Sequence, residues 1–257
     1  MTGRPRRVPT CLFLTALLPL ILATACSDDS PPAPTSTAVP TATATPPTPA
    51  TATSVPPTPT PEPVRLDILA SRLAIPALDI DTAVQLSQTT PYTYVPPPGC
   101  PPRPQDTQTV TVPSQGVATP EDNLEGLENK AWIYGHSRWL GTPGLFLSLQ
   151  EIDLGDEILI DGVDRATGAP VAGERFVVNG IYLTDVDSGE TLINAESPAD
   201  IPTKPVVILQ TSVREDGAGK QWILNQEALL AKATNLVEGD LNDRCKYLLL
   251  FVTAQAS

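Results

Sequence analysis

The chain is predicted to hold one mostly-β domain, a barrel or a sandwich, and three observations support this. From residue 64 onward, short runs of β-favouring residues recur, separated by Gly, Pro, Asn and Asp. Only two stretches have the residue spacing of a helix. The 194 residues of 64–257 are enough to bury a single core, whereas residues 27–63 before them are too poor in apolar side chains to fold.

The runs give an order of elements. Candidate strands are predicted at 72–75, 107–112, 130–134, 157–160, 174–183, 206–211 and 247–253. A short helix is predicted around 143–149, before a tight turn at Gly155-Asp156. A second helix is predicted over 220–236, with Gly239 as its stop. Its apolar residues recur near helical spacing, at Trp222, Ile223, Leu229, Leu230, Ala233 and Val237.

Residues 1–25 have the features of an export signal. A basic start is followed by a mostly apolar run at 11–25, which is shorter than the roughly 20 residues that a membrane-spanning helix needs. The basic residues are Arg4, Arg6 and Arg7. Small residues precede Cys26 as in a bacterial lipobox, although Ala23 stands where a leucine is usual. We expect Cys26 to be lipidated, and the alternative is simple cleavage or an uncleaved anchor.

Residues 26–63 are predicted to form an extended extracellular stalk. The segment 27–63 holds 12 prolines, 10 threonines and no aromatic residue, a composition typical of polyproline II chains. At about 3.1 Å per residue, it would reach on the order of 100 Å. We interpret it as a spacer that holds the domain away from a membrane; the alternative is a tail with no role in positioning.

Charge and residue counts exclude several classes of site. The net charge is −13, and because residues 1–63 sum to zero, the domain at 64–257 carries all of it. An acidic domain of this kind is not expected to bind nucleic acid. His136 is the only histidine, and the four cysteines are too few for a zinc ribbon, so we expect neither a metal nor another cofactor.

Three stretches bear on function. They are RLAIPALDIDTAV at 72–84, WIYGH at 132–136 followed by Phe146, Leu149 and GDEI at 155–158, and ILQTS at 208–212. In order and spacing they resemble the sortases, exported transpeptidases. The resemblance covers about residues 70–253, and it is the order of the motifs that makes it specific. It implies a closed eight-stranded β-barrel, with the helix at 220–236 inserted between the last two strands.

The resemblance also implies roles for residues. In the family, a cysteine thiolate attacks the threonyl carbonyl of a sorting signal, the histidine of "GH" serves as acid or base, and an arginine stabilises the oxyanion. His136 matches that histidine. The alternative is a hydrogen-bonded or surface histidine after a strand.

Ser212 departs from the family pattern, because it stands where the family has its cysteine. A serine hydroxyl is effectively never ionised at neutral pH and needs an oriented base, whereas a cysteine is partly thiolate. The cysteine mechanism is therefore excluded at this position. Acyl transfer or hydrolysis by serine stays open, and so does a catalytically silent barrel that binds a peptide.

The arginine position is ambiguous. Arg244 is preferred, since it shortly precedes the apolar run at 247–253. The family's usual spacing would instead place Gln221 or Lys220 there, and Arg214 is a weaker candidate. A surface salt bridge is the alternative role for Arg244.

Cys100 and Cys245 are the only cysteines of the domain at 64–257, and outside the cell we expect them to form a disulfide. Cys245 as a displaced nucleophile is the alternative. Strand alternation opposes it, because neighbouring side chains point to opposite faces and Arg244 would already face the site.

The sequence thus predicts a sortase-like lipoprotein on the extracellular face of a bacterial cell membrane. It would act on peptide sorting signals by acyl transfer or hydrolysis through Ser212, with an amine acceptor in the cell envelope. The alternative is an inactive member of the fold that serves as a peptide-binding or envelope-assembly module. In both cases the lipid anchor is the contact with the membrane.

Overall fold

The computed structural model describes residues 66–257 apart from 103–104, 123–125, 186–188, 190–192, 194–196, 198, 214–222, 237–244 and 246. The predicted signal peptide and stalk, at 1–25 and 26–63, lie outside the described residues. So do four candidates for the arginine position and the candidate lipidation site: Arg214, Lys220, Gln221, Arg244 and Cys26. No helix within the described ranges is both long and apolar enough to cross a membrane.

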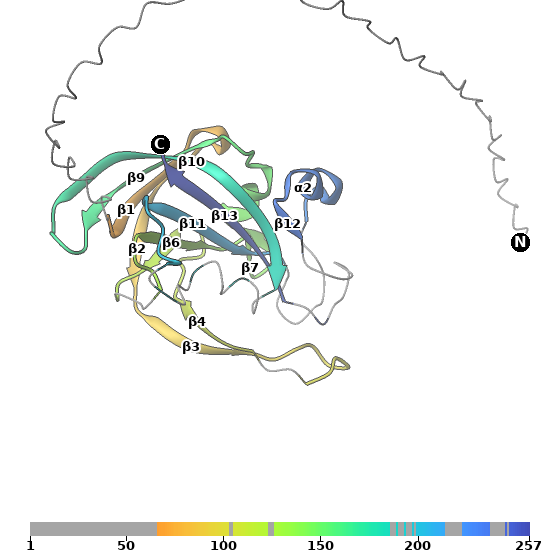
Figure 1. Cartoon of the computed structure of the whole chain (residues 1–257). Helices are drawn as coiled ribbons and strands as arrows, with labels where there is room; N and C mark the ends of the chain where they lie inside the picture. Colours follow the sequence, from red (N-terminus) through yellow and green to blue (C-terminus); the bar gives the residue numbers. More distant parts are fainter. Residues whose placement is uncertain are drawn as a thin grey trace, which may run out of the picture. The chain divides into compact units, whose positions relative to one another are not determined.

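Eight strands close into a barrel, which confirms the predicted fold class (Figure 1). Around the barrel they run β1, β2, β5, β6, β11, β13, β10 and β9, and β9 closes the ring by pairing with both β1 and β10. The eight are β1 Ile68–Ile75, β2 Ile80–Ser87, β5 Val117–Pro120, β6 Lys130–Gly135, β9 Glu157–Asp164, β10 Pro170–Asp185, β11 Val206–Ser212 and β13 Leu248–Ala256.

Shorter elements decorate the barrel. The hairpin of β3 (Thr89–Tyr94) and β4 (Gln105–Val110) leaves it between β2 and β5 and projects from its side (Figure 1). The remaining short elements are η1 Pro76–Leu78, β7 Arg138–Trp139, β8 Thr142–Pro143, the 3₁₀ helix η2 Leu145–Glu151, the helix α2 Gln226–Lys232 and β12 Asn235–Leu236.

The helix between the last two barrel strands is shorter than predicted. It was expected over 220–236 but spans Gln226–Lys232, between β11 and β13 in the chain. Asn225 explains the later start, because its side chain accepts a hydrogen bond from the N–H of Ala228 at 3.0 Å and so caps the helix. Residues 220–222 lie outside the described residues.

The interior of the barrel is the main core. It receives buried apolar side chains from every barrel strand, as strand alternation requires. One from each strand, in chain order, is Leu73, Val84, Val117, Ile133, Ile160, Ile181, Leu209 and Val252. Phe146 and Leu149 of η2 join the same core and are fully buried. The "F--L" spacing in the sequence therefore places two side chains of one short helix into the barrel.

A second, smaller core covers part of the outer face. It contains Trp132 of β6, Ile208 of β11, and Leu249 and Phe251 of β13, with Ile193 packed among them. These strand residues alternate with those that face the interior, so the three adjacent strands are buried on both faces. Such burial explains why their sequences are nearly continuous apolar runs.

Polar side chains fix the start of β6. Lys130 is buried, and its Nζ donates to the carbonyls of Gly126 and Ile193 at 2.9 and 2.8 Å. This burial lowers the pKa of Lys130. The neighbouring Asn129 accepts from the N–H of Leu66 at 2.9 Å. The first described residues of the domain are thereby attached to the strand that leads to His136.

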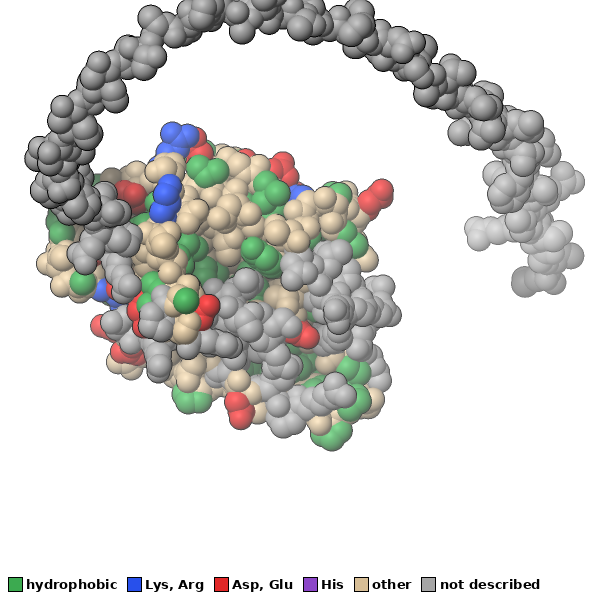
Figure 2. Space-filling view, in the orientation of Figure 1, with side chains coloured by type: hydrophobic (Ala, Val, Ile, Leu, Met, Phe, Trp, Pro, Cys, Tyr) green, Lys and Arg blue, Asp and Glu red, His purple; other side chains and the backbone are tan. Residues whose placement is uncertain are grey.

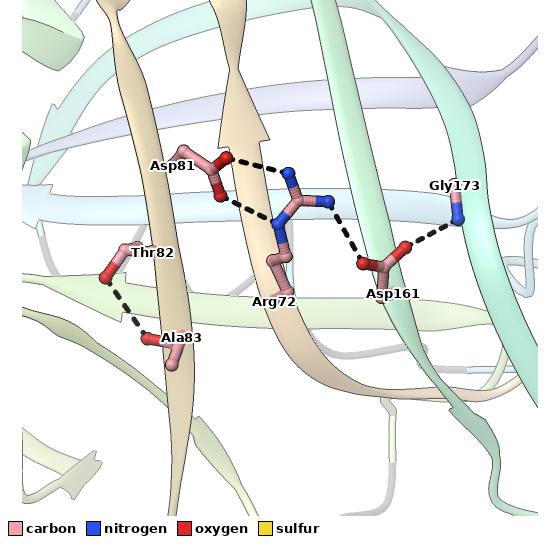
Figure 3. A network of polar contacts seen from close by, with 6 residues as sticks. All are labelled: Arg72, Asp81, Thr82, Ala83, Asp161 and Gly173. Atoms are coloured by element: carbon pink, nitrogen blue, oxygen red, sulfur yellow. Dashed lines mark hydrogen bonds and ion pairs between the residues drawn. The ribbon is translucent and has the colours of Figure 1, made fainter.

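An arginine bridges three strands on the outside of the barrel (Figure 3). Arg72 of β1 donates through Nε and Nη2 to the carboxylate of Asp81 on β2, at 2.7 and 2.8 Å. Its Nη1 donates to Asp161 on β9 at 3.0 Å, and that carboxylate also accepts from the N–H of Gly173 at 2.6 Å. The hydrogen bonds from Arg72 lower the pKa of Asp81, and the hydrogen bonds from Gly173 and Arg72 lower the pKa of Asp161. Asp81 is exposed and Arg72 and Asp161 are partly exposed, so these ion pairs contribute little to the stability of the barrel.

On the face of the domain in Figure 2, charged side chains are scattered among apolar and uncharged ones. Lysine and arginine side chains lie singly among the residues drawn in colour, and acidic side chains lie beside them or apart. The surplus of acidic residues in the composition is therefore not gathered into one patch on the described part of this face.

Candidate functional site

His136 and Ser212 lie at the same edge of the barrel, at the ends of neighbouring parallel strands. The last register pair of β6 and β11 is Tyr134 with Gln210, and each candidate residue follows two positions later. A side chain also joins the two strand ends, because Ser137 Oγ donates to the carbonyl oxygen of Ser212. Two motifs that are 76 positions apart in the sequence are thus side by side.

Strand alternation places the side chain of Ser212 on the outer face of the barrel, and His136, the residue after β6, continues the same alternation. On β6, Ile133 belongs to the interior core while Trp132 belongs to the outer one, and on β11 the same holds for Leu209 and Ile208. His136 and Ser212 have the parity of the outer residues. Ser212 is also paired with Leu249 of β13, which lies in the outer core.

Packing explains why a glycine precedes the histidine in the "GH" motif. The ring of Phe146 lies against Gly135, and a Cβ at this position would be 2.5 Å from Phe146 Cδ2. The same phenylalanine donates its backbone N–H to the carbonyl of His136 at 3.0 Å. Gly144 approaches from the other side, where a Cβ would be 2.2 Å from the oxygen of His136. The backbone of His136 is therefore held between the end of β6 and the start of η2.

Two aromatic rings contact the imidazole of His136. Tyr134, two residues earlier on the same strand, presents its ring at 6.1 Å between centroids and a 64° angle between planes. Trp139 of β7 lies closer, at 4.6 Å and 33°. Sequence reasoning missed Trp139. The sequence signal that could have indicated it is the dipeptide Leu140-Gly141, which forms the turn of a hairpin next to the histidine.

Ser212 is nearly enclosed. Its exposed fraction is 9%, and it lies between β6 and β13 in the sheet. Two polar atoms beside it are buried with no hydrogen-bond partner in the described part of the chain, namely Gln210 Oε1 and Thr211 Oγ1. Gln210 shares the outer face with Ser212, whereas Thr211 points into the barrel. A buried polar atom of this kind is costly in a folded protein unless something satisfies it.

The structure joins Cys100 and Cys245 in a disulfide with an S–S distance of 2.10 Å. Nearby, Tyr94 of β3 stacks on Tyr247 at 4.7 Å between ring centroids. Both contacts attach the β3–β4 segment to the chain just before β13. Because its sulfur is in a disulfide, Cys245 is not available as a displaced nucleophile.

The arginine of the predicted site is not placed, since Arg244 and its alternatives at 214, 220 and 221 lie outside the described residues. Within the described ranges, no three or more His, Cys, Asp or Glu side chains are grouped as metal ligands would be. The structure thus brings together two of the three residues of the predicted site.

Comparisons with known proteins give a weak likeness. No protein-family model and no curated protein sequence matches the chain. Among solved structures, the chain is similar to sortase A of Listeria monocytogenes, with 11% identity, coverage of 74% of this chain and 88% of that one, and a TM-score of 0.36. It is also similar to the SrtA sortase of Actinomyces oris, with 13% identity, 77% and 87% coverage and a TM-score of 0.38.

A third similar structure is sortase E1 of Streptomyces coelicolor with a tripeptide in its active site, at 10% identity, 74% and 89% coverage and a TM-score of 0.36. TM-scores and identities this low carry no argument about the activity of this chain. What the chain itself provides is a closed barrel with a histidine and a serine at adjacent strand ends.

Proposed function

We propose that the chain is a sortase-like acyl-transfer protein that acts on peptides at the end of β6 and β11. The observation that carries the proposal is the parallel register of these strands, in which His136 and Ser212 each follow the pair Tyr134–Gln210 by two residues. By strand alternation, both side chains would lie on the outer face of the barrel. A hydroxyl and an imidazole on one face are the minimum for nucleophilic catalysis by serine.

The proposed reaction has two steps. Ser212 Oγ attacks the carbonyl carbon of a peptide bond in a sorting signal, and His136 accepts the hydroxyl proton. The tetrahedral intermediate then expels the amine, which takes the proton from His136, and an ester to Ser212 remains. An amine in the cell envelope, or water, attacks this ester and loses a proton to His136. The bond to Ser212 Oγ then breaks, and His136 returns the proton to this oxygen. Arg244 is the proposed donor to the oxyanion.

The proposal includes the location of the protein. Lipidation at Cys26 would attach the chain to the extracellular face of a bacterial membrane, and the stalk at 26–63 would hold the domain at 64–257 away from it. Peptide and amine acceptor would then both come from the cell envelope. The partner classes are a peptide or protein carrying a sorting signal, an amine acceptor and the membrane.

A second candidate function is peptide binding without turnover. The observation that favours it is Ser212 itself, because a hydroxyl in place of a thiol lowers the intrinsic reactivity of the position. The same face of β6 and β11 would then hold a peptide in an envelope assembly.

Mass spectrometry separates the two. The purified chain is incubated with threonine-containing peptides in the presence of a small amine, and an acyl adduct on Ser212 and a ligated product are sought. We expect Ser212→Ala to abolish both and the exposed control Ser197→Ala to change neither. Ser212→Cys should form the adduct faster than the wild-type chain. If neither wild type nor Ser212→Cys gives an adduct or product, acyl transfer is excluded, and retained peptide affinity would favour the second function.

A further inference from the structure

The segment that follows His136 is a minimal hairpin. Strands β7 and β8 pair Arg138 with Pro143 and Trp139 with Thr142, so only Leu140 and Gly141 form the turn. Both turn residues have positive φ, 48° and 80°, the pattern of the type I′ turn that suits the twist of a tight hairpin. The backbone of Trp139 is therefore placed by a short, fully paired unit.

The base of this hairpin is fixed to the backbone around His136. The N–H of Gly144 donates to the carbonyl of Ser137 at 2.8 Å, directly below the hairpin, and Phe146 donates to the carbonyl of His136. At the tip, Arg138 Nη1 donates to the carbonyl of Gly141 at 3.3 Å. Hairpin and histidine thus share one hydrogen-bonded frame.

Trp139 contacts the imidazole although it lies at the surface. Its exposed fraction is 45%, yet its ring centroid is 4.6 Å from that of His136 with 33° between the planes. Tyr134 contacts the same imidazole edge-on from β6. The buried apolar clusters of the described residues do not include Trp139, so its ring contacts the histidine rather than the core.

We propose that Trp139 is a positioning residue that holds the imidazole of His136 against the indole face and stabilises its protonated form. Its consequence for acyl transfer rests on the proposed function, whereas the ring contact itself does not. An indole face attracts a cation above it, so an imidazolium gains more from this contact than a neutral imidazole does.

Charged groups on the elements around His136 also influence its titration. Arg138 lies on the hairpin itself, Lys130 at the far end of β6 and Glu151 at the far end of η2, while the described residues of β5, β11 and β13 carry no charged side chain. A variant at Trp139 keeps all of these in place. A change in the titration of His136 then reports the loss of the ring.

Because His136 is the only histidine, its Hε1 resonance can be followed by NMR in the full-length chain without assignment. We expect Trp139→Ala to remove the ring-current shift of this resonance and to lower the pKa of His136 by about 0.5, with Trp139→Phe in between. Leu140→Ala is the matched control, because it removes an 88% exposed side chain from the same hairpin. Thermal melts of all variants report whether the fold is kept.

Two outcomes overturn the proposal: a resonance and a pKa in Trp139→Ala that match the wild type, or equal changes in Leu140→Ala. If the wild-type chain forms an adduct on Ser212, Trp139→Ala should slow adduct formation about tenfold, with little change in the peptide concentration that half-saturates it. Absence of any adduct in the wild type would count against the proposed function only, since the NMR result does not require activity.

Discussion

Removal of the disulfide between Cys100 and Cys245 should lower the stability of the domain more than any other single change outside the core. The bond closes a loop of 145 residues, which reaches from the β3–β4 segment to the residues before β13 and so includes most of the barrel. In the reduced, unfolded chain these two ends are free to separate. Their loss of freedom in the oxidised chain raises the free energy of the unfolded state.

The size of the effect follows from the loop length. For 145 residues, the chain-entropy relation gives about 5 kcal/mol at 25 °C as an upper limit. Because the unfolded chain keeps some residual structure, we expect the double variant Cys100→Ser, Cys245→Ser to lose about 3–5 kcal/mol. For a domain of this size, each kcal/mol corresponds to roughly 2–4 °C in Tm, so the melting temperature should fall by about 6–20 °C.

Urea unfolding followed by circular dichroism measures the change. The two single variants should match the double variant within about 0.5 kcal/mol, because each breaks the same bond. Val95→Ser is the matched control, since its side chain is 71% exposed in the same segment and should change stability little. A loss below about 1 kcal/mol in the double variant, or a wild-type chain with two reactive thiols, would refute the reasoning.

Three further substitutions test the packing around the site. Gly135→Ala places a Cβ against the ring of Phe146, so it should cost about 1–3 kcal/mol in urea unfolding and disturb His136; a neutral result would contradict the contact. Thr211→Val removes a buried hydroxyl that has no partner in the described chain and should stabilise by about 1 kcal/mol, whereas a clear loss would reveal a partner. Asparagine is favoured at a φ of 48°, so Leu140→Asn should raise Tm by roughly 1–4 °C. A lower Tm would argue against the turn.

The strands that the sequence predicts well are those buried on both faces. The expected run at 206–211 corresponds to β11, and 130–134 corresponds to β6. The run at 247–253 lies within β13 except for its first residue. These three are adjacent in the sheet and lie between the interior core and the outer cluster, so almost every position is apolar. Continuous apolar runs of this length are the strongest signal that a short strand can give.

The strands that were missed have weak patterns for physical reasons. In β2, Ile80–Ser87, exposed positions outnumber buried ones and do not alternate strictly. In β3, Thr89–Tyr94, the four middle residues are exposed, and one of them is a proline. Their pairing depends on neighbours that are distant in the sequence, such as β5 for β2, and no local pattern encodes that contact.

For the site, the family resemblance implied that the two motifs belong to one site, but not what surrounds them. The glycine of "GH" and the phenylalanine ten residues after the histidine have a direct physical link, because the ring of Phe146 occupies the space that a side chain at Gly135 would need. Trp139 lies in a short polar and glycine-rich stretch with no periodicity. Its contact with the imidazole arises from a two-residue turn, which a motif search does not weigh.

A serine rather than a cysteine as the proposed nucleophile changes which features of this barrel matter most. A thiolate forms in part without help, so a cysteine enzyme tolerates a loosely held histidine better than a serine enzyme does. Cys245 is in a disulfide, and therefore any acyl transfer at the proposed Ser212 site depends on the hydroxyl and on its base. Three contacts fix His136: the hydrogen bond from the backbone of Phe146 and the rings of Tyr134 and Trp139. A serine nucleophile needs an oriented base, so the reaction requires these contacts. Loosening them should then cost more activity in the serine chain than in Ser212→Cys, and this comparison links the positioning of His136 to the chemistry proposed for it.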